Sequence, residues 1–398
     1  MTITAEILRT AADEVMAETI AIRRYLHQNP ELSGEEEKTA KFIAEQCRAL
    51  GCDIRENIGG HGLLARLPPC KTGETILLRA DMDALPIQDG KQCDYASSVD
   101  GISHSCGHDV HSAMLLGTMM LLSRLHLMLP YNVAALFQPA EEITEGAAAM
   151  LKDGVLQGLD AQRIYALHVY PYLPSGSIGL KSGAMCAAAD MFEVEITGHG
   201  GHAARPHECV DVILIASHII QALHHIVSRR VDPMHPAVVT IGQINAGHAA
   251  NVMPEKASFS GTVRSLNIEA HEEIRTRMDH IIRQTAETWG ATARFHMRHA
   301  TPILKNDPDI IEEVRRNIST LSPDTNMIDI DQPSMGGEDF AEFLQHVPGC
   351  LMRLGTGSEP STRYPLHHPR FDIDEEAMRS GIITLALLAI SPISRKGL

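Results

Sequence analysis

The sequence lacks the features of a membrane, nucleic-acid-binding or disulfide-rich protein. It has no apolar run of about eighteen residues, so we expect no membrane-spanning helix. Its 34 Lys and Arg residues are outnumbered by 50 Asp and Glu residues, and a formal net charge of −16 leaves little basic surface for a phosphate backbone. Its eight cysteines form no CxxC pair and no closely spaced framework, so we expect free thiols. We therefore predict a protein that binds neither nucleic acid nor a membrane.

Low-complexity tracts and internal repeats are also absent from the sequence. The N-terminal segment, through Ser33, is typical of a polar amphipathic helix and lacks the short apolar centre of a signal peptide. We therefore expect a cytoplasmic protein. Because 398 residues exceed what a single hydrophobic core usually supports, we also expect two domains.

Short apolar runs alternate with helical patterns in the first and last parts of the chain. This alternation predicts an α/β fold with a central, mostly parallel sheet. The expected strands cover residues 74–86, 131–142, 162–174 and 349–357. The expected helices cover residues 38–51, 111–129 and 374–390.

The pattern changes near residue 190 to the order β-α-β-β-α-β, which is typical of a ferredoxin-like unit. Its expected elements cover residues 191–198, 209–230, 236–245, 256–265, 268–290 and 291–299. We therefore predict a discontinuous main domain of residues 1–186 and 299–398, interrupted by an inserted domain of residues 187–298.

Polar side chains follow the three early strands. Asp81 and Asp83 end the first strand, Glu141 and Glu142 follow the second, and His168 ends the third. In open α/β sheets, ligands bind outside the carboxyl ends of the strands. These five side chains are therefore expected at one edge of the sheet.

Two loops add further ligand-type side chains. The segment SHSCGHDVH, residues 103–111, contains Cys106 and His108 and runs directly into a helix. The segment YPLHHPRFDID contributes His367 and His368 near the C-terminus. Thiolate, imidazole and carboxylate donors together suit a zinc-type ion. Because five segments supply such donors, the sequence predicts a metal site.

The adjacent Glu141 and Glu142 indicate what such a site does. A metal-dependent hydrolase needs a carboxylate ligand and a second carboxylate that takes a proton from water. The pair can divide these two roles. Two other readings compete: a cysteine hydrolase that uses Cys106 and His108, and a non-catalytic metal-binding protein. The first leaves the remaining donors unexplained, and the second has no need of a carboxylate that is not a ligand.

Nine segments, in order along almost the whole chain, carry a family resemblance. They are RRYLHQNPELSGEEEKTAKFI, LLRADMDALP, SHSCGHDVHSAMLLG, LFQPAEE, ALHV, ITGHGGHAARPH, GHAANVMPEKASFSGTVRS, MGGEDF and LHHPRFDIDEEA. Together they resemble the aminoacylase and carboxypeptidase-like metalloamidohydrolases. The most similar branch contains hippurate hydrolases, N-acyl-amino-acid amidohydrolases and auxin-conjugate hydrolases. The resemblance implies a catalytic domain with a two-metal site and an inserted lid domain that usually makes a dimer.

The resemblance also implies roles for residues of the main domain. Glu141 falls on the general base, Asp83 on the aspartate that orients a ligand, and Asp81 where other branches have a metal-binding histidine. His368 falls on a position that varies in the family, and we expect it not to be a ligand. The implied metal ligands are Cys106, His108, Glu142, His168 and His367.

In the inserted domain, His202 matches the family's histidine for the substrate carbonyl. Asn251 and Arg264 match positions that often contact substrate, and Arg264 is a candidate for binding the carboxylate of the product amino acid. Gly337 and Glu338 resemble a loop that lines the site.

We therefore expect hydrolysis of the amide bond of N-acyl-amino acids, which releases a carboxylic acid and a free amino acid. The expected cofactor is one or two divalent ions, zinc or manganese, with cobalt and nickel as alternatives. The expected partners are a small-molecule substrate and further copies of the chain, in a homodimer or homotetramer. A metal-dependent dipeptidase or carboxypeptidase would share all of these residues and differ only in pocket shape.

Overall fold

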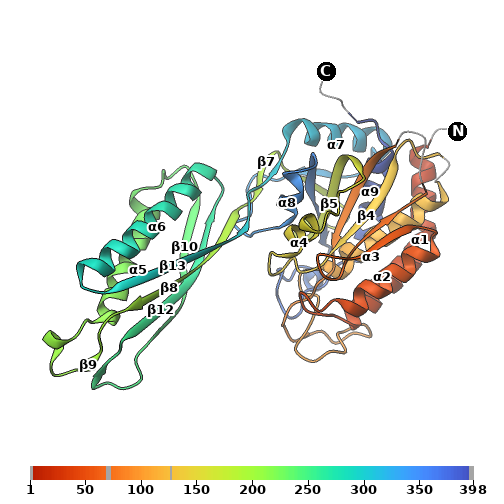
Figure 1. The fold of residues 1–398 in the computed structure, drawn as a ribbon. Helices are drawn as coiled ribbons and strands as arrows, with labels where there is room; N and C mark the ends of the chain where they lie inside the picture. The colour runs from red at the N-terminus through yellow and green to blue at the C-terminus, as the bar shows by residue number, and fades with distance from the viewer. Residues whose placement is uncertain (1–2, 69–72, 126–127, 394–398) are drawn as a thin grey trace. The chain divides into compact units, whose positions relative to one another are not determined.

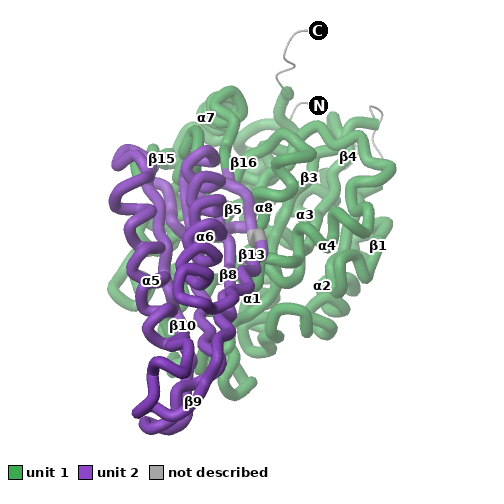
Figure 2. The backbone as a smooth tube through the Cα atoms, turned by 60° about the vertical axis from the view of Figure 1, so that its left-hand side comes forward, with its two compact units in different colours: residues 1–185, 305–332, 339–398 green, residues 186–304, 333–338 purple. Residues whose placement is uncertain are grey.

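The computed structural model describes residues 3–68, 73–125 and 128–393, which form two compact units. Unit 1 comprises residues 1–185, 305–332 and 339–398, and unit 2 comprises residues 186–304 and 333–338 (Figure 2). The inserted segment extends past the boundary expected at residue 298, because its last strand continues to Thr301, which pairs with Ala189.

Unit 1 is built on an eight-stranded sheet with the order β1-β2-β4-β3-β5-β16-β6-β15 (Figure 1). The four central strands are parallel, β1 and β2 are antiparallel additions at one end, and β6 is antiparallel to β16. The expected α/β class with a mostly parallel central sheet is confirmed. The strands are β1 (Asp53–Ile58), β2 (Gly62–Arg66), β3 (Glu74–Asp81), β4 (Asn132–Gln138), β5 (Asp160–Pro174), β6 (Ile178–Leu180), β15 (Met327–Asp329) and β16 (Gly349–Gly357).

The carboxyl ends of the parallel strands carry the polar residues singled out above. Strand β3 is buried on both faces, as its continuous apolar run predicts for a central parallel strand, and it ends at Asp81. Glu141 lies three residues beyond the end of β4. His168 lies within β5, because this strand continues to Pro174. It pairs with Arg353 of β16. The expectation that His168 ends its strand is wrong.

The helices of unit 1 include a central group of three, α1, α3 and α9, which pack on one another (Figure 1). Helix α3 is buried on all sides from His108 to Leu122, consistent with its continuous apolar sequence. It begins earlier than the expected residue 111, and residues 126–127 of that expected helix lie outside the described residues. The helices are α1 (Ala5–Gln28), α2 (Glu37–Ala49), α3 (His108–Arg124), α4 (Gly146–Lys152), α7 (Pro308–Leu321), α8 (Phe340–Leu344), the 3-10 helix η3 (Pro360–Thr362) and α9 (Ala377–Ile390).

Unit 2 has the expected β-α-β-β-α-β order and an antiparallel sheet of order β10-β12-β8-β13 (Figure 1). Apolar side chains of its helices and strands, among them Ile219, Ile282, Val194 and Phe259, form a second core. The elements are β8 (Ala188–Thr197), α5 (Val212–Arg229), β10 (Ala237–Ala246), β12 (Lys256–Ser265), α6 (Ile268–Thr288) and β13 (Thr292–Thr301). Its shorter elements are β9 (Gly201–His202), the 3-10 helix η2 (Pro206–Glu208) and β11 (Val252–Met253). The strands β7 (Gly183–Cys186) and β14 (Leu304–Asn306) span the points where the chain passes from one unit to the other.

Helix α5 is long and apolar enough, by length and composition, to cross a membrane. Its side chains divide into two faces. The exposed face carries polar residues such as Gln221 and His225, which is the pattern of an amphipathic core helix. The buried face consists of Val212, Ile215, Ala216, Ile219, Leu223 and Ile226.

Candidate metal centre

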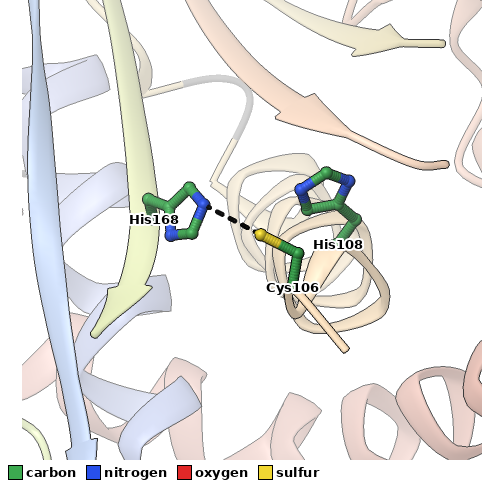
Figure 3. Close-up of side chains that lie close together, drawn as sticks. All are labelled: Cys106, His108 and His168. Carbon is green, nitrogen blue, oxygen red and sulfur yellow. Dashed lines mark hydrogen bonds between the residues drawn. The ribbon is translucent and has the colours of Figure 1, made fainter. Parts of the chain in front are cut away.

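The loop before α3 places Cys106 and His108 side by side in the interior (Figure 3). Gly107 between them has a φ of 85°, in the left-handed region that favours glycine. A Cβ atom at this position would lie 2.5 Å from Cγ2 of Val169, so the loop also needs glycine for space. The short CGH sequence is therefore a turn that presents two ligand-type side chains together.

Cys106 faces His168 of β5, with 3.7 Å between Sγ and Nε2 (Figure 3). Nδ1 of His168 lies 2.8 Å from the carbonyl oxygen of Val169 and donates to it, so the lone pair of Nε2 is directed at the thiol. Burial lowers the pKa of His168 well below its ordinary value. Burial, assisted by Glu142, raises the pKa of the Cys106 thiol well above its ordinary value.

Asp83 orients His108 through a 3.0 Å contact between Oδ1 and Nδ1. Ser33 and the backbone N–H of Glu142 donate to the other oxygen of Asp83 at 2.7 and 2.9 Å. Because Asp83 engages Nδ1, the nitrogen of His108 that remains open to another partner is Nε2. It is buried and has no hydrogen-bond partner within the described part of the chain.

Glu141 and Glu142 face this nitrogen from the turn between β4 and α4. Oε1 of Glu142 lies 3.8 Å from Nε2 of His108, and Oε2 of Glu141 lies 3.9 Å from it. Oε1 of Glu142 is itself buried without a hydrogen-bond partner among the described residues. Burial raises the pKa of Glu142, although His108 and His367 oppose the shift.

The turn that carries the two glutamates is held by a buried acid of the α2 N-terminus. Ala140 has a φ of 53°, which is strained for a residue with a Cβ. Its backbone N–H donates to Oε1 of the fully buried Glu36 at 2.8 Å. Glu36 was not singled out from the sequence, although it lies in the segment PELSGEEE that contributed to the family resemblance.

His367 approaches the same cluster from the C-terminal loop. Its backbone N–H donates to the carbonyl of Ser105 at 2.8 Å, and its Nε2 lies 3.5 Å from Oε2 of Glu142. His368 is used within its own loop, where it stacks on Tyr364 and accepts the N–H of Arg370 at 3.0 Å.

Asp81 belongs to a neighbouring network. It accepts from Arg79 at 2.7 Å and from Nδ1 of His111 at 2.5 Å. Nε2 of His111 accepts the N–H of Val169 at 2.9 Å, so both nitrogens of this ring are engaged. His111 was also given no role from the sequence, although its position one helical turn after His108 indicates a shared face.

These donors fit a bound metal ion. Nε2 of His108 and Oε1 of Glu142 are two of the buried atoms without a hydrogen-bond partner among the described residues, and a cation bound between them would satisfy both. A mixture of thiol, imidazole and carboxylate donors favours zinc and neighbouring transition metals over magnesium or calcium. Among the described residues, five groups of donor atoms lie within 4.8 Å of one another. Two of them are Asp81, His108 and His111, and Glu141, Glu338 and Asp339. The other three contain the predicted ligands: Cys106, His108 and His168; Cys106, Glu142 and His367; and His108, Glu141 and Glu142.

Unit 2 brings together two of the three residues that were expected to contact substrate. The strands β9 and β11 pair His202 with Val252, so that Asn251 lies beside His202. Nδ1 of the exposed His202 accepts the N–H of Ala204 at 3.1 Å, which leaves Nε2 as an N–H donor. Arg264 lies apart on β12, where it donates to the carbonyl of Met335 at 3.2 Å.

Comparison with known proteins gives close relatives over nearly the whole chain. An N-acetyl-L-cysteine deacetylase of Bacillus subtilis is 41% identical over 359 residues, covering 90% of this chain and 84% of its own length. Thermostable carboxypeptidase 2 of Saccharolobus solfataricus is 36% identical, covering 97% and 98% of the two chains.

A solved structure from Bacillus subtilis, described as a dinuclear metal-binding peptidase of the M20 family, is 34% identical with a TM-score of 0.81. It covers 95% of this chain and 98% of its own. The family model described as peptidase family M20/M25/M40 matches residues 77–391. This match spans most of both units, and the chain belongs to peptidase family M20/M25/M40.

Proposed function

We propose that this protein hydrolyses the amide bond of N-acyl-amino acids with the help of one or two divalent metal ions. The observation that carries the proposal is the convergence of Glu141 and Glu142 on the open nitrogen of His108. One carboxylate of such a pair can bind metal while the other accepts a proton and donates it again. The family, whose members are hydrolases, supports the reaction class.

The proposed metal ligands are five donors from four segments of the chain. Zinc or manganese is the expected ion, with cobalt or nickel as alternatives. When bound, the ion would polarise the scissile carbonyl and acidify the attacking water. The ligands are Cys106, His108, Glu142, His168 and His367.

Glu141 is the proposed general base and acid. It takes a proton from the attacking water and returns it to the leaving nitrogen, so that the amine departs as a neutral group. Asp83 holds Nδ1 of His108 in the protonated tautomer, which directs the lone pair of Nε2 into the cluster.

His202, Asn251 and Arg264 are proposed to bind substrate. The Nε2 hydrogen of His202 suits an oxyanion donor, a role commonly worth about 2.7–4 kcal/mol. Asn251, beside it, offers an amide to the same end of the substrate. Arg264 is proposed to bind the carboxylate of the amino acid, although its hydrogen bond to Met335 engages part of the guanidinium.

Carboxypeptidase or dipeptidase activity is the second candidate, because one of the relatives is named a carboxypeptidase. Acetyl, benzoyl and longer acyl derivatives of several amino acids would be tested beside dipeptides. Each would be assayed with metal-depleted protein, before and after zinc or manganese is added. We expect hydrolysis of acyl-amino acids only with metal. Cleavage confined to dipeptides would favour the second candidate, and full activity without measurable metal would overturn both.

A further inference from the structure

The two cysteines at the end of α2, Cys47 and Cys52, lie outside the candidate metal centre. The helix ends in a turn in which Gly51 has a φ of 76° and the N–H of Cys52 donates to the carbonyl of Cys47 at 3.2 Å. In this type of helix ending, the side chains of the two hydrogen-bonded residues frequently come into contact. Cys52 packs here against the core cluster that contains Cys47.

The two thiols differ in environment. Cys47 is completely buried in the core of unit 1, whereas Cys52 is partly exposed. The neighbouring Cys47 lowers the pKa of Cys52, although partial burial opposes the shift, and the pKa of Cys47 is raised by Cys52 and by burial. An accessible thiol with a lowered pKa, next to a second thiol, is the arrangement found in oxidation-sensitive cysteine pairs.

We propose that Cys47 and Cys52 form a reversible oxidation site, in which Cys52 reacts with a hydroperoxide and Cys47 then closes a disulfide. The Cys52 thiolate attacks one oxygen of hydrogen peroxide, the O–O bond breaks, and hydroxide leaves, so that Cys52 becomes a sulfenic acid. The Cys47 sulfur then attacks the Cys52 sulfur, and the sulfenic oxygen leaves as water with the thiol proton. Overall two thiols are oxidised and one peroxide is reduced to two waters.

The site is independent of the proposed hydrolase function, since neither cysteine belongs to the candidate metal centre. It gives the chain a peroxide-reactive thiol whose oxidation a thiol reductant can reverse. Irreversible oxidation of Cys52 beyond the sulfenic acid is avoided because Cys47 captures that intermediate first.

The sequence makes the disulfide directly measurable. Trypsin cleaves after Lys41, Arg48 and Arg55, so Cys47 and Cys52 fall in separate peptides, residues 42–48 and 49–55. The intact protein would be treated with hydrogen peroxide, its remaining thiols alkylated, and the protein digested without reduction. We expect a linked pair of these peptides, lighter than their sum by two hydrogens, which dithiothreitol separates.

Two variants test the order of the steps. Cys47→Ala should leave Cys52 as a sulfenic acid that dimedone traps, and Cys52→Ser should leave Cys47 unmodified. Cys93, which is also partly exposed, is the internal comparator and should react more slowly than Cys52. If Cys52 in the unmodified protein passes to sulfinic or sulfonic acid with no linked peptide, or reacts no faster than Cys93, the proposal is overturned.

Discussion

Glu141 and Glu142 are chemically identical neighbours, and only their surroundings assign them different roles. Glu142 lies in donor groups with Cys106, His108 and His367, whereas Glu141 lies in one group with His108 and Glu142 and in another with Glu338 and Asp339. This difference is the basis for proposing Glu142 as the ligand and Glu141 as the proton carrier.

Replacing each glutamate by glutamine separates the two roles. Glu141→Gln should retain bound metal but lose about 10²–10⁴-fold in turnover, because only proton transfer is removed. Glu142→Gln should lose metal. Metal content by mass spectrometry and turnover with an acyl-amino acid provide the two measurements, and the reverse pattern would exchange the assignments.

Cys106 is the donor that most favours a transition metal. Cys106→Ser should weaken metal binding, because a hydroxyl is a poorer ligand than a thiolate. In the unmodified protein, added metal should also slow alkylation of Cys106 by iodoacetamide, since a coordinated thiolate is shielded and less nucleophilic. Equal alkylation rates with and without metal would place Cys106 outside the metal site.

At the level of elements, α2 positions the turn after β4 through Glu36. Glu36→Ala would leave the buried N–H of Ala140 unpaired, at a cost of about 1–3 kcal/mol in the free energy of unfolding. Because the turn carries both glutamates, turnover should fall further than stability alone explains. Glu36→Gln keeps an acceptor oxygen and is the matched control. Denaturant unfolding, metal content and turnover would be compared, and equal losses in the two variants would contradict this account.

Three segments of unit 1 are joined by the fully buried Arg23 of α1. It donates to Asp109 of α3 at 2.9 Å, and to Asp372 and Glu375, before α9, at 2.8 and 3.1 Å. Burial alone would raise the pKa values of Asp109 and Asp372, but His27 and Arg23 hold that of Asp109 well below its ordinary value. Arg23 also lowers that of Asp372.

These lowered pKa values predict acid sensitivity. A carboxylate that binds its proton less readily in the folded state stabilises the fold above its ordinary pKa of 3.8, and this stabilisation is lost as the pH falls below that value. Asp372→Asn should therefore be less stable than the unmodified protein at neutral pH, and the difference should shrink below about pH 4. Unfolding with a chelator present removes the contribution of metal. A difference in stability between the two proteins that stays constant with pH would rule out this origin of the acid sensitivity.

For the whole molecule, the proposed oxyanion donor His202 belongs to unit 2, whereas the candidate metal centre belongs to unit 1. We expect a homodimer in which one subunit supplies His202 to the other. His202→Ala and Glu141→Gln should each be inactive alone. Mixed subunits should regain activity, approaching about one quarter of the sites if the two variants pair at random in a two-fold dimer.

Native mass spectrometry of the mixture would verify that subunits have exchanged. Exchange without recovered activity would mean that each subunit uses its own His202. If the protein is strictly monomeric, each chain must likewise use its own His202.

The sequence by itself determined the order of elements and the chemistry of the donors. Apolar periodicity depends on neighbouring residues, so the ferredoxin-like unit and the central α/β sheet were predicted from short segments. The cluster of cysteine, histidine and glutamate side chains was also predicted from short segments, because its members lie in motifs that each span a few residues. The family resemblance rests on these motifs in order.

The tertiary structure decided how each of these side chains is used. His108 and His111 lie three residues apart on one helix, yet Asp83 leaves Nε2 of His108 open, while Asp81 and Val169 engage both nitrogens of His111. Likewise, Glu36 reaches the turn at Ala140 across more than one hundred residues of sequence. Hydrogen-bond partners are chosen by proximity in the folded chain, and no local pattern records which distant segment arrives at a given ring nitrogen or amide.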